Sequence, residues 1–173
     1  MIPPLPGTSA EVVGFNNVKQ VSCGELHAAF ITTDGKLYTF GDNQFGTLGD
    51  GTYNHASIPT LIEGFNNIIQ ISCGEYHSAF LTADGTVYTF GREKYGCLGH
   101  DGIPNVPNLV HGINDVIQVS CSENLTAVIT KMGRVYVFGE IGEKRFWRPT
   151  LIPELKNIIH IGSGLRDVTC IVG

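Results

Sequence analysis

The sequence reads VKQVSCGELHAAFITTDGKLYTFG over residues 18–41. The same pattern returns as IIQISCGEYHSAFLTADGTVYTFG over residues 68–91, and as VIQVSCSENLTAVITKMGRVYVFG over residues 116–139. A fourth copy begins at residue 157. The copies recur about every 50 residues, a period typical of chains in which each repeat is one supersecondary unit.

Within each copy, short segments rich in β-branched and aromatic residues alternate with turn signals. In the first copy, Asp34-Gly35 stands between two apolar runs, and this is a strong signal for a tight β-hairpin. Asp84-Gly85 and Met132-Gly133 take the same place later, and in each pair the Gly supplies the positive φ that the turn needs. The three strands expected from the first copy are residues 18–23, 28–32 and 37–40.

A fourth segment in each copy contains a proline: residues 58–62, 106–110 and 148–152. Because Pro cannot donate to a hydrogen-bond ladder on both sides, these segments are predicted to be outermost strands. Residues 2–5 look like one further outer strand, and no amphipathic helix of useful length is expected. Four short strands in a repeat of about 50 residues are typical of a β-propeller blade. The predicted fold class is therefore all-β.

The repeat boundaries predict about three and a half blades. A lead-in occupies residues 1–13, and the repeats occupy residues 14–63, 64–111, 112–155 and, in part, 156–173. An open arc of blades leaves apolar faces bare at both ends, and exposed patches of that size are rare on monomers. We therefore expect either a piece of a longer propeller or one half of a homo-oligomer in which two copies complete seven blades.

The composition narrows the class of protein. Hydrophobic residues make up 42% and charged residues 16%, which is a globular composition and excludes a disordered chain. The formal net charge of −5 argues against binding to nucleic acid or to an anionic membrane, and no apolar run is long enough to cross a bilayer. Five cysteines, an odd number at long intervals, favour a reducing intracellular compartment, cytoplasmic or nuclear, over a disulfide framework.

Four short segments carry a family resemblance. FGDNQFGTLG at residues 40–49 and FGREKYGCLG at residues 90–99 resemble the turn signature of the regulator of chromosome condensation repeat. SCGELH at residues 22–27 and SCGEYH at residues 72–77 are similar to the second hallmark of that family. The resemblance covers residues 14–173 and implies blades of a seven-bladed propeller of this type.

The resemblance also directs attention to the loop between the first two strands of each repeat. In family members that act as guanine nucleotide exchange factors, acidic and His residues of this loop contact the small GTPase. Here no inserted β-wedge interrupts the compact repeats, which argues against exchange. We therefore predict a protein-protein interaction scaffold, with a small-GTPase regulator as the alternative and a plain solvated loop as the competing interpretation. The residues predicted to contact the protein partner are Glu25, Leu26, His27, Glu75, Tyr76, His77, Glu123 and Asn124.

The third repeat departs most from the pattern. After Gly139 the Gly-x-Leu-Gly turn is lost, and the only Trp of the chain, Trp147, stands near Lys144, Arg145 and Arg148. Because Trp and Arg are favoured interface anchors, Trp147 joins the predicted partner-binding residues. The alternative is that its ring covers the edge of the core.

A metal site and an enzyme are both disfavoured. Cys23, His27, Cys73, His77 and Cys121 are ligand types, but they occupy one repeated column and so belong to different blades. We predict that the two histidines are buried and hydrogen-bonded, and that the cysteines are small core residues. No nucleophile elbow, phosphate-binding loop or close carboxylate pair stands out. The sequence predicts no catalytic residue, no metal and no cofactor.

Overall fold

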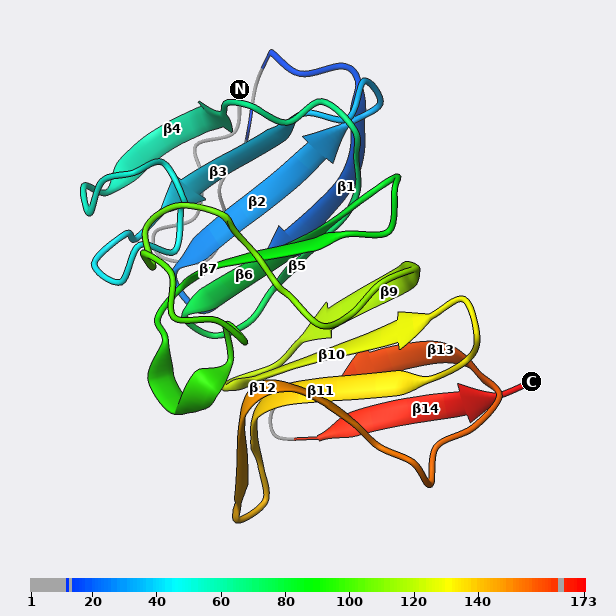
Figure 1. Cartoon of the computed structure of the whole chain (residues 1–173). Coiled ribbons are helices and arrows are strands. Elements are labelled where there is room, and N and C mark those ends of the chain that lie inside the picture. The colour runs from blue at the N-terminus through cyan, green and yellow to red at the C-terminus, as the bar shows by residue number, and fades with distance from the viewer. Residues whose placement is uncertain (1–11, 13, 165–166) are drawn as a thin grey trace.

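The structure, a computed structural model, describes residue 12, residues 14–164 and residues 167–173. It contains three four-stranded antiparallel sheets and one two-stranded sheet, each made from consecutive strands. Figure 1 shows the sheets following one another as the successive blades of an open arc. The all-β propeller fold expected from the repeats is confirmed. The strand predicted at residues 2–5 lies outside the described residues.

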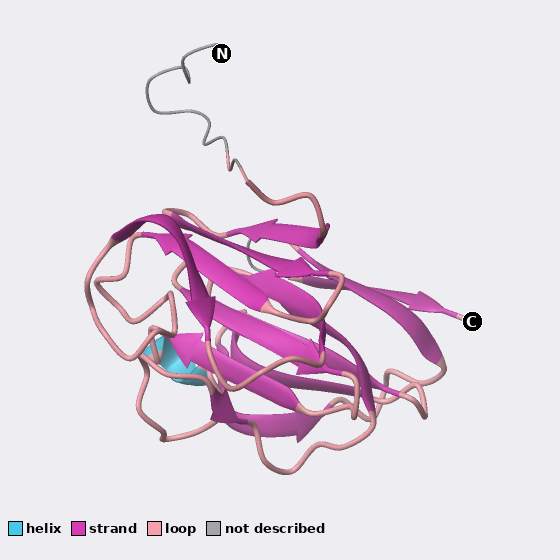
Figure 2. Ribbon diagram, turned by 90° about the horizontal axis from the view of Figure 1, so that it is seen from above, coloured by secondary structure: helices cyan, strands magenta, loops and turns pink. Residues whose placement is uncertain are grey.

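We number the sheets blades 1 to 4. Blade 1 contains β1 (Val18–Cys23), β2 (His27–Thr32), β3 (Leu37–Gly41) and β4 (Ala56–Ile62). Blade 2 contains β5 (Ile68–Cys73), β6 (His77–Thr82), β7 (Val87–Gly91) and β8 (Asn108–Leu109). Blade 3 contains β9 (Val116–Cys121), β10 (Leu125–Thr130), β11 (Val135–Ile141) and β12 (Lys144–Leu151), and β13 (Ile158–Ser163) and β14 (Val168–Val172) form blade 4. In the described part of the chain the one helical turn is η1 (Lys94–Gly96), drawn in cyan in Figure 2.

The predicted hairpin turns are present and also join the blades. Gly35, Gly85 and Gly133 have φ values of 76°, 81° and 68°, as a tight turn of this kind requires. Each turn carbonyl then accepts the N–H that begins the next blade: Ile68 N–H donates to Gly35 O at 3.1 Å, and the equivalent bonds in the later blades are 3.1 and 3.2 Å long. The turn that closes one hairpin therefore also positions the next inner strand.

The outer strands differ from the prediction. The strand expected at residues 106–110 is reduced to Asn108–Leu109, because Pro107 has no N–H to donate and the Asn108 side chain instead donates to the carbonyls of Ile103 and Val106, both at 2.7 Å. In blade 3 the outer strand begins at Lys144 rather than at Arg148, since β11 and β12 form a direct hairpin in place of the lost turn.

The apolar core lies between the blades. One cluster joins Leu37 of blade 1 to Ile71 and Phe80 of blade 2, and similar clusters join blade 2 to blade 3 and blade 3 to blade 4. Burying a Leu or Phe side chain contributes roughly 1.5–3 kcal/mol. A blade therefore gains most of its stability from its neighbours.

Glutamine side chains bridge the inner strands β1, β5, β9 and β13, which lie side by side. Gln70 Nε2 donates to Val119 O at 3.0 Å, and Val119 N–H donates to Gln70 Oε1 at 2.9 Å. The same two-point bond joins Gln20 to Ile71 and Gln118 to Ile161. We name this paired hydrogen bond the glutamine bridge. It ties the first strand of each blade to the next.

The two ends of the arc differ from its middle. Val21 occupies the position of Ile71, but it is 59% exposed whereas Ile71 is 1% exposed. At the other end, His160 and Gly162 take the places of the Gln and the Ser of the earlier inner strands. Among the described residues, the first blade thus receives no glutamine bridge and the last offers none.

The glutamine bridge makes a stability prediction. Gln70→Ala removes both hydrogen bonds and leaves the N–H and C=O of Val119 unpaired between two blades, so we expect the free energy of unfolding to fall by about 1–3 kcal/mol. Equilibrium urea unfolding followed by circular dichroism measures it. Gln44→Ala, at an exposed site, is the control and should unfold like the wild type. Equal midpoints for the two variants would contradict the assigned role.

Candidate functional site

Three glutamates from successive blades meet at one groove. Glu25, Glu75 and Glu123 come from the loops that join the first two strands of blades 1, 2 and 3, and they line a groove of about 510 Å³. We name these three side chains the glutamate rim. The groove is also lined by Cys23, Gly24, Cys73, Gly74, Cys121, Ser122 and Gly164.

Backbone hydrogen bonds fix the spacing of the rim. In blades 1 to 3 the residue before each glutamate donates its N–H to the carbonyl three residues later, at 2.8 Å, so each loop is a closed turn. Successive loops are then joined, because the Glu25 N–H donates to Glu75 O at 3.3 Å and the Glu75 N–H donates to Ser122 O at 3.2 Å. The rim is therefore a feature of the backbone as well as of the side chains.

The carboxylates of the rim influence one another. Desolvation raises the pKa of Glu75, and a hydrogen bond with Glu25 and the negative charges of Glu123 and Glu25 raise it further. The Tyr76 hydroxyl bonds the Glu25 carboxylate, and this bond, with partial burial and both nearby carboxylates, raises the pKa of Tyr76 to about 12. The rim thus concentrates negative charge, and a positive group bound there would reduce the repulsion between the carboxylates.

The two histidines of these loops are buried, at 4% exposed for His27 and 1% for His77. Each contacts the neighbouring blade: His27 Nε2 lies 2.9 Å from Ser78 Oγ, and His77 Nε2 lies 2.9 Å from Thr126 Oγ1. They therefore join neighbouring blades. The prediction that both histidines are buried and hydrogen-bonded is confirmed. Their proposed part in direct partner contact is corrected, because the surrounding blades cover both rings.

The hydroxyl partner sets the tautomer of His77. Thr126 Oγ1 donates its single proton to Cys97 O at 2.8 Å, and Ser78 Oγ donates to Thr47 O at 3.3 Å. The Thr126 hydroxyl therefore accepts from the imidazole of His77, whose Nε2 carries the hydrogen. Desolvation lowers the pKa of His27 to about 4, against a smaller opposing effect of Asp42, and it lowers the pKa of His77 to about 3. Both rings are neutral at pH 7.

A glycine accompanies each buried histidine for a steric reason. A Cβ on Gly24 would stand 2.2 Å from the ring of His27 and 2.4 Å from Gly74 O, and a Cβ on Gly74 would stand 2.4 Å from the ring of His77 and 2.3 Å from Ser122 O. In blade 3 both members change together, to Ser122 and Leu125. This paired change was visible in the sequence, but its cause appears only once the ring is placed beneath the loop.

Cys73 and Cys121 are buried core residues at the base of the groove, as predicted. Burial raises the pKa of the Cys73 thiol to about 11 and that of Cys121 to about 12, so neither is a thiolate at neutral pH. Cys23 is exposed, so the prediction that it is a core residue is wrong: no described blade covers it. Within the described ranges, no group of three or more His, Cys, Asp or Glu side chains is placed to hold a metal ion. No helix in that part of the chain is long and apolar enough to cross a membrane.

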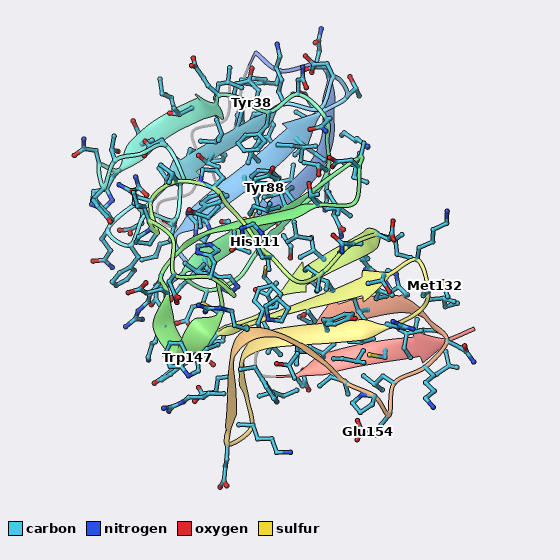
Figure 3. All side chains as sticks on the ribbon, viewed as in Figure 1. Tyr38, Tyr88, His111, Met132, Trp147 and Glu154 are labelled. Atoms are coloured by element: carbon cyan, nitrogen blue, oxygen red, sulfur yellow. The ribbon has the colours of Figure 1, made fainter. Side chains whose placement is uncertain are left out.

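The remaining predicted contact residues are spread over the same face and its edge. Leu26 is 58% exposed beside Glu25, and Asn124 is half-buried and donates from Nδ2 to Glu123 Oε1 at 3.1 Å. Trp147 is 58% exposed on β12, away from the groove, and packs beside Gly96 of η1. Figure 3 shows Trp147, on β12, far from Glu154, which lies in the segment that joins β12 to β13.

Sequence reasoning missed the aromatic and basic residues around the rim. The Arg92 guanidinium lies 4.7 Å from the centre of the Phe45 ring and 5.3 Å from that of Tyr76. At the next junction Lys94 and Arg145 lie 4.4 and 4.3 Å from the centre of the Tyr95 ring. The available signal was the aromatic residue that recurs in the turn signature, at Phe45 and Tyr95.

The fold and this site define a class: a repeat protein of propeller blades with a loop face built from successive repeats. Two models of the regulator of chromosome condensation (RCC1) repeat match the chain, one over residues 34–81 and 84–129 and the other over residues 18–47 and 68–97. The chain belongs to the regulator of chromosome condensation repeat family.

Curated relatives match short stretches. The human X-linked retinitis pigmentosa GTPase regulator is 50% identical over 46 residues, which is 25% of this chain and 4% of that protein. The bifunctional serine/threonine-protein kinase/NEDD4-like E3 ubiquitin-protein ligase of Dictyostelium discoideum is 41% identical over 54 residues, which is 31% of this chain and 3% of that protein. The chain thus matches only a small part of the length of these relatives.

Solved propellers match nearly the whole chain. Human WBSCR16 superimposes with a TM-score of 0.83 and 28% identity, over 94% of this chain and 47% of that protein. Prp20p of Saccharomyces cerevisiae, described together with its binding to Gsp1p and histones, superimposes with a TM-score of 0.78 and 24% identity, over 91% of this chain and 44% of that protein. The chain therefore spans about half of each of these propellers.

The buried histidines predict a pH dependence. Their folded pKa values lie below the ordinary value of 6.5, so the unfolded state binds more protons and stability falls as the pH falls from 6.5 toward 4. Each histidine contributes a slope of at most about 1.4 kcal/mol per pH unit. The double variant His27→Gln/His77→Gln, which keeps side-chain donors but cannot titrate, should show a flatter curve between pH 6.5 and 5 in urea unfolding. Parallel curves would show that the rings are not the source.

Proposed function

We propose that this chain is a protein-binding module whose contact surface is the face that carries the glutamate rim, and that it binds without turning over a substrate. The observation that carries the proposal is the convergence of Glu25, Glu75 and Glu123 on one groove. Three like charges at fixed spacing favour a partner with a complementary basic patch. Leu26 and Tyr76 supply the apolar and aromatic surface beside the charges.

The contrast between constrained and variable positions within each loop supports this proposal. Gly24 and Gly74 serve the fold, because a Cβ at either position would collide with a buried His ring and with a backbone carbonyl of the next blade. Leu26, Tyr76 and Asn124 occupy one column and differ in every blade. Positions that the fold leaves free can carry specificity, and loops on a rigid scaffold are where binding residues gather.

The relatives give two kinds of support. Gsp1p and histones are the proteins named with the structurally similar Prp20p, so protein partners are known for this fold. A relative with 50% local identity is named a GTPase regulator, and this favours a small GTPase as the second candidate partner. We propose plain binding ahead of nucleotide exchange, because no wedge-like insertion interrupts the described blades.

Charge reversal tests the rim. Gsp1p and core histones, immobilised separately, serve as the probes for biolayer interferometry. Because a change of about 1.4 kcal/mol is tenfold in affinity, Glu75→Lys should weaken binding to the preferred probe by roughly tenfold or more. Glu154→Lys, the same charge change in the segment that joins β12 to β13, is the control and should bind like the wild type (Figure 3). Equal loss in both variants would mean that only net charge matters.

Salt dependence provides a separate check. Exposed charges are screened over about 8 Å at physiological ionic strength, so raising salt from 50 to 300 mM should weaken the wild-type complex and reduce the difference between wild type and Glu75→Lys. Binding that is insensitive to salt would point away from the rim and toward an apolar contact.

The rate of labelled GDP release from Gsp1p separates binding from exchange. We expect release to be unchanged by this chain. Acceleration of roughly a hundredfold, about 2.7 kcal/mol off the barrier, would replace the scaffold by an exchange factor.

A further inference from the structure

The junctions between blades can be compared position by position, because the repeats place equivalent residues in equivalent surroundings. At the junction of blades 1 and 2, the Phe45 ring meets Tyr76 edge to face at 5.3 Å between ring centres, and Arg92 lies over both rings. The chain's own aromatic and guanidinium groups occupy the space beside the rim there.

The next junction has equivalent backbone hydrogen bonds but different side chains, and its blade 3 side belongs to the direct β11–β12 hairpin. Arg92 N–H donates to Tyr76 O at 2.8 Å, and in blade 3 Glu140 N–H donates to Asn124 O at 2.9 Å. These equivalent bonds show that Asn124 of blade 3 occupies the position of Tyr76 in blade 2, and that Glu140 occupies the position of Arg92. A large ring and a cation have been replaced by a short amide and a carboxylate.

The exchange leaves a pocket of about 460 Å³ between blades 2 and 3. Its wall on the blade 2 side is formed by Lys94 and Tyr95. The blade 3 side contributes Ser122, Glu123, Asn124, Glu140 and Gly142. The pocket lies beside the rim, because Ser122 and Glu123 also line the groove.

The wall of the pocket is rich in hydrogen-bond acceptors. It carries the carboxylates of Glu123 and Glu140 and the amide oxygen of Asn124, whose Nδ2 is directed to Glu123. Ser122 is 6% exposed, and its Oγ is buried with no hydrogen-bond partner among the described residues. A buried polar atom without a partner is costly, so an occupant that brings donors would satisfy it.

The acceptors around the pocket favour an occupant with several donors. Arg145 Nε bonds Glu140 Oε1 at 3.0 Å and lies over Tyr95, so the chain already seats one guanidinium at the edge of this junction. Lys94 and Arg145 contribute two positive charges against the carboxylates of Glu123 and Glu140, so the formal charges around the pocket sum to zero. A guanidinium presents five N–H donors and no acceptor, and it stacks on aromatic rings.

We propose that the pocket between blades 2 and 3 receives an arginine side chain of the protein partner. The inserted guanidinium donates to Glu123 and Glu140, with the Asn124 amide oxygen and the Ser122 hydroxyl within the same wall. This assignment rests on the proposed protein-binding function, and it specifies the type of partner residue that is bound and the pocket that binds it. It makes Asn124 and Glu140 the residues that distinguish the second junction from the first.

Solution NMR of the ¹⁵N-labelled chain tests the proposal with N-acetyl-L-arginine amide as the probe, at pH 7. We expect saturable shifts of the Tyr95, Asn124 and Glu140 amides, with a dissociation constant on the order of millimolar for a single side chain. N-acetyl-L-citrulline amide, nearly isosteric but neutral, should cause none. Equal shifts with citrulline, stronger binding of N-acetyl-L-tyrosine amide, or shifts confined to Glu25 and Glu75 would each overturn the proposal.

Two variants localise the effect. Asn124→Tyr restores the residue that fills the first junction, and should abolish the arginine-induced shifts while the rest of the spectrum keeps its dispersion. Glu140→Gln should weaken binding at least threefold, and Glu154→Gln should leave it unchanged. If Asn124→Tyr binds arginine like the wild type, the pocket is not the site.

The experiments distinguish failure of the arginine-pocket proposal from failure of the proposed protein-binding function. If histones or Gsp1p bind Asn124→Tyr as tightly as wild type but lose Glu75→Lys, the protein-binding function stands and the arginine pocket is refuted. If the arginine probe binds as predicted but neither protein does, the pocket stands and the proposed partners do not.

Discussion

The structure depends on burial between blades. Leu37, Ile71 and Phe80 meet across a junction rather than inside one sheet, so no blade can hide its apolar faces alone. The glutamine bridge and the buried histidines add directed hydrogen bonds at the same junctions. The loop above each buried histidine ring has a glycine, because a Cβ there would collide with the ring. The loop face owes its fixed shape to these contacts.

That constraint determines which residues are free to vary. A loop whose first and last residues are held by a closed turn and by a buried ring exposes only the positions between them. The rim glutamate recurs in three blades, whereas the next residue is Leu26, Tyr76 or Asn124. Equivalent loops therefore border a filled junction and an open one, which differ in the Asn124 and Glu140 side chains and in the β11–β12 hairpin that replaces the turn.

Much of the fold followed from local signals. β-branched segments and glycine turns such as Asp34-Gly35 are read within one repeat, so the blades, the hairpins and the burial of His27 could be predicted. The short β8 could not, because it depends on the Asn108 side chain capturing two nearby carbonyls. The pocket could not either, since Tyr95 and Glu140 come together only when two blades pack. The repeat identified Glu25, Glu75 and Glu123 as equivalent loop residues, but their mutual effect on pKa depends on the distances between loops.

The glutamine bridge has a direction, because the side chain of one inner strand reaches the backbone of the strand that follows it. At Val21 the backbone position that would receive such a side chain is exposed, and at His160 the side chain that would reach onward is a different one. The two ends of the arc are therefore not equivalent. The first inner strand has a backbone position that could receive a glutamine bridge, and the last inner strand lacks the glutamine that would form one. Any ring closed across β13 has a seam there, held by packing without the paired bonds that secure the other joints.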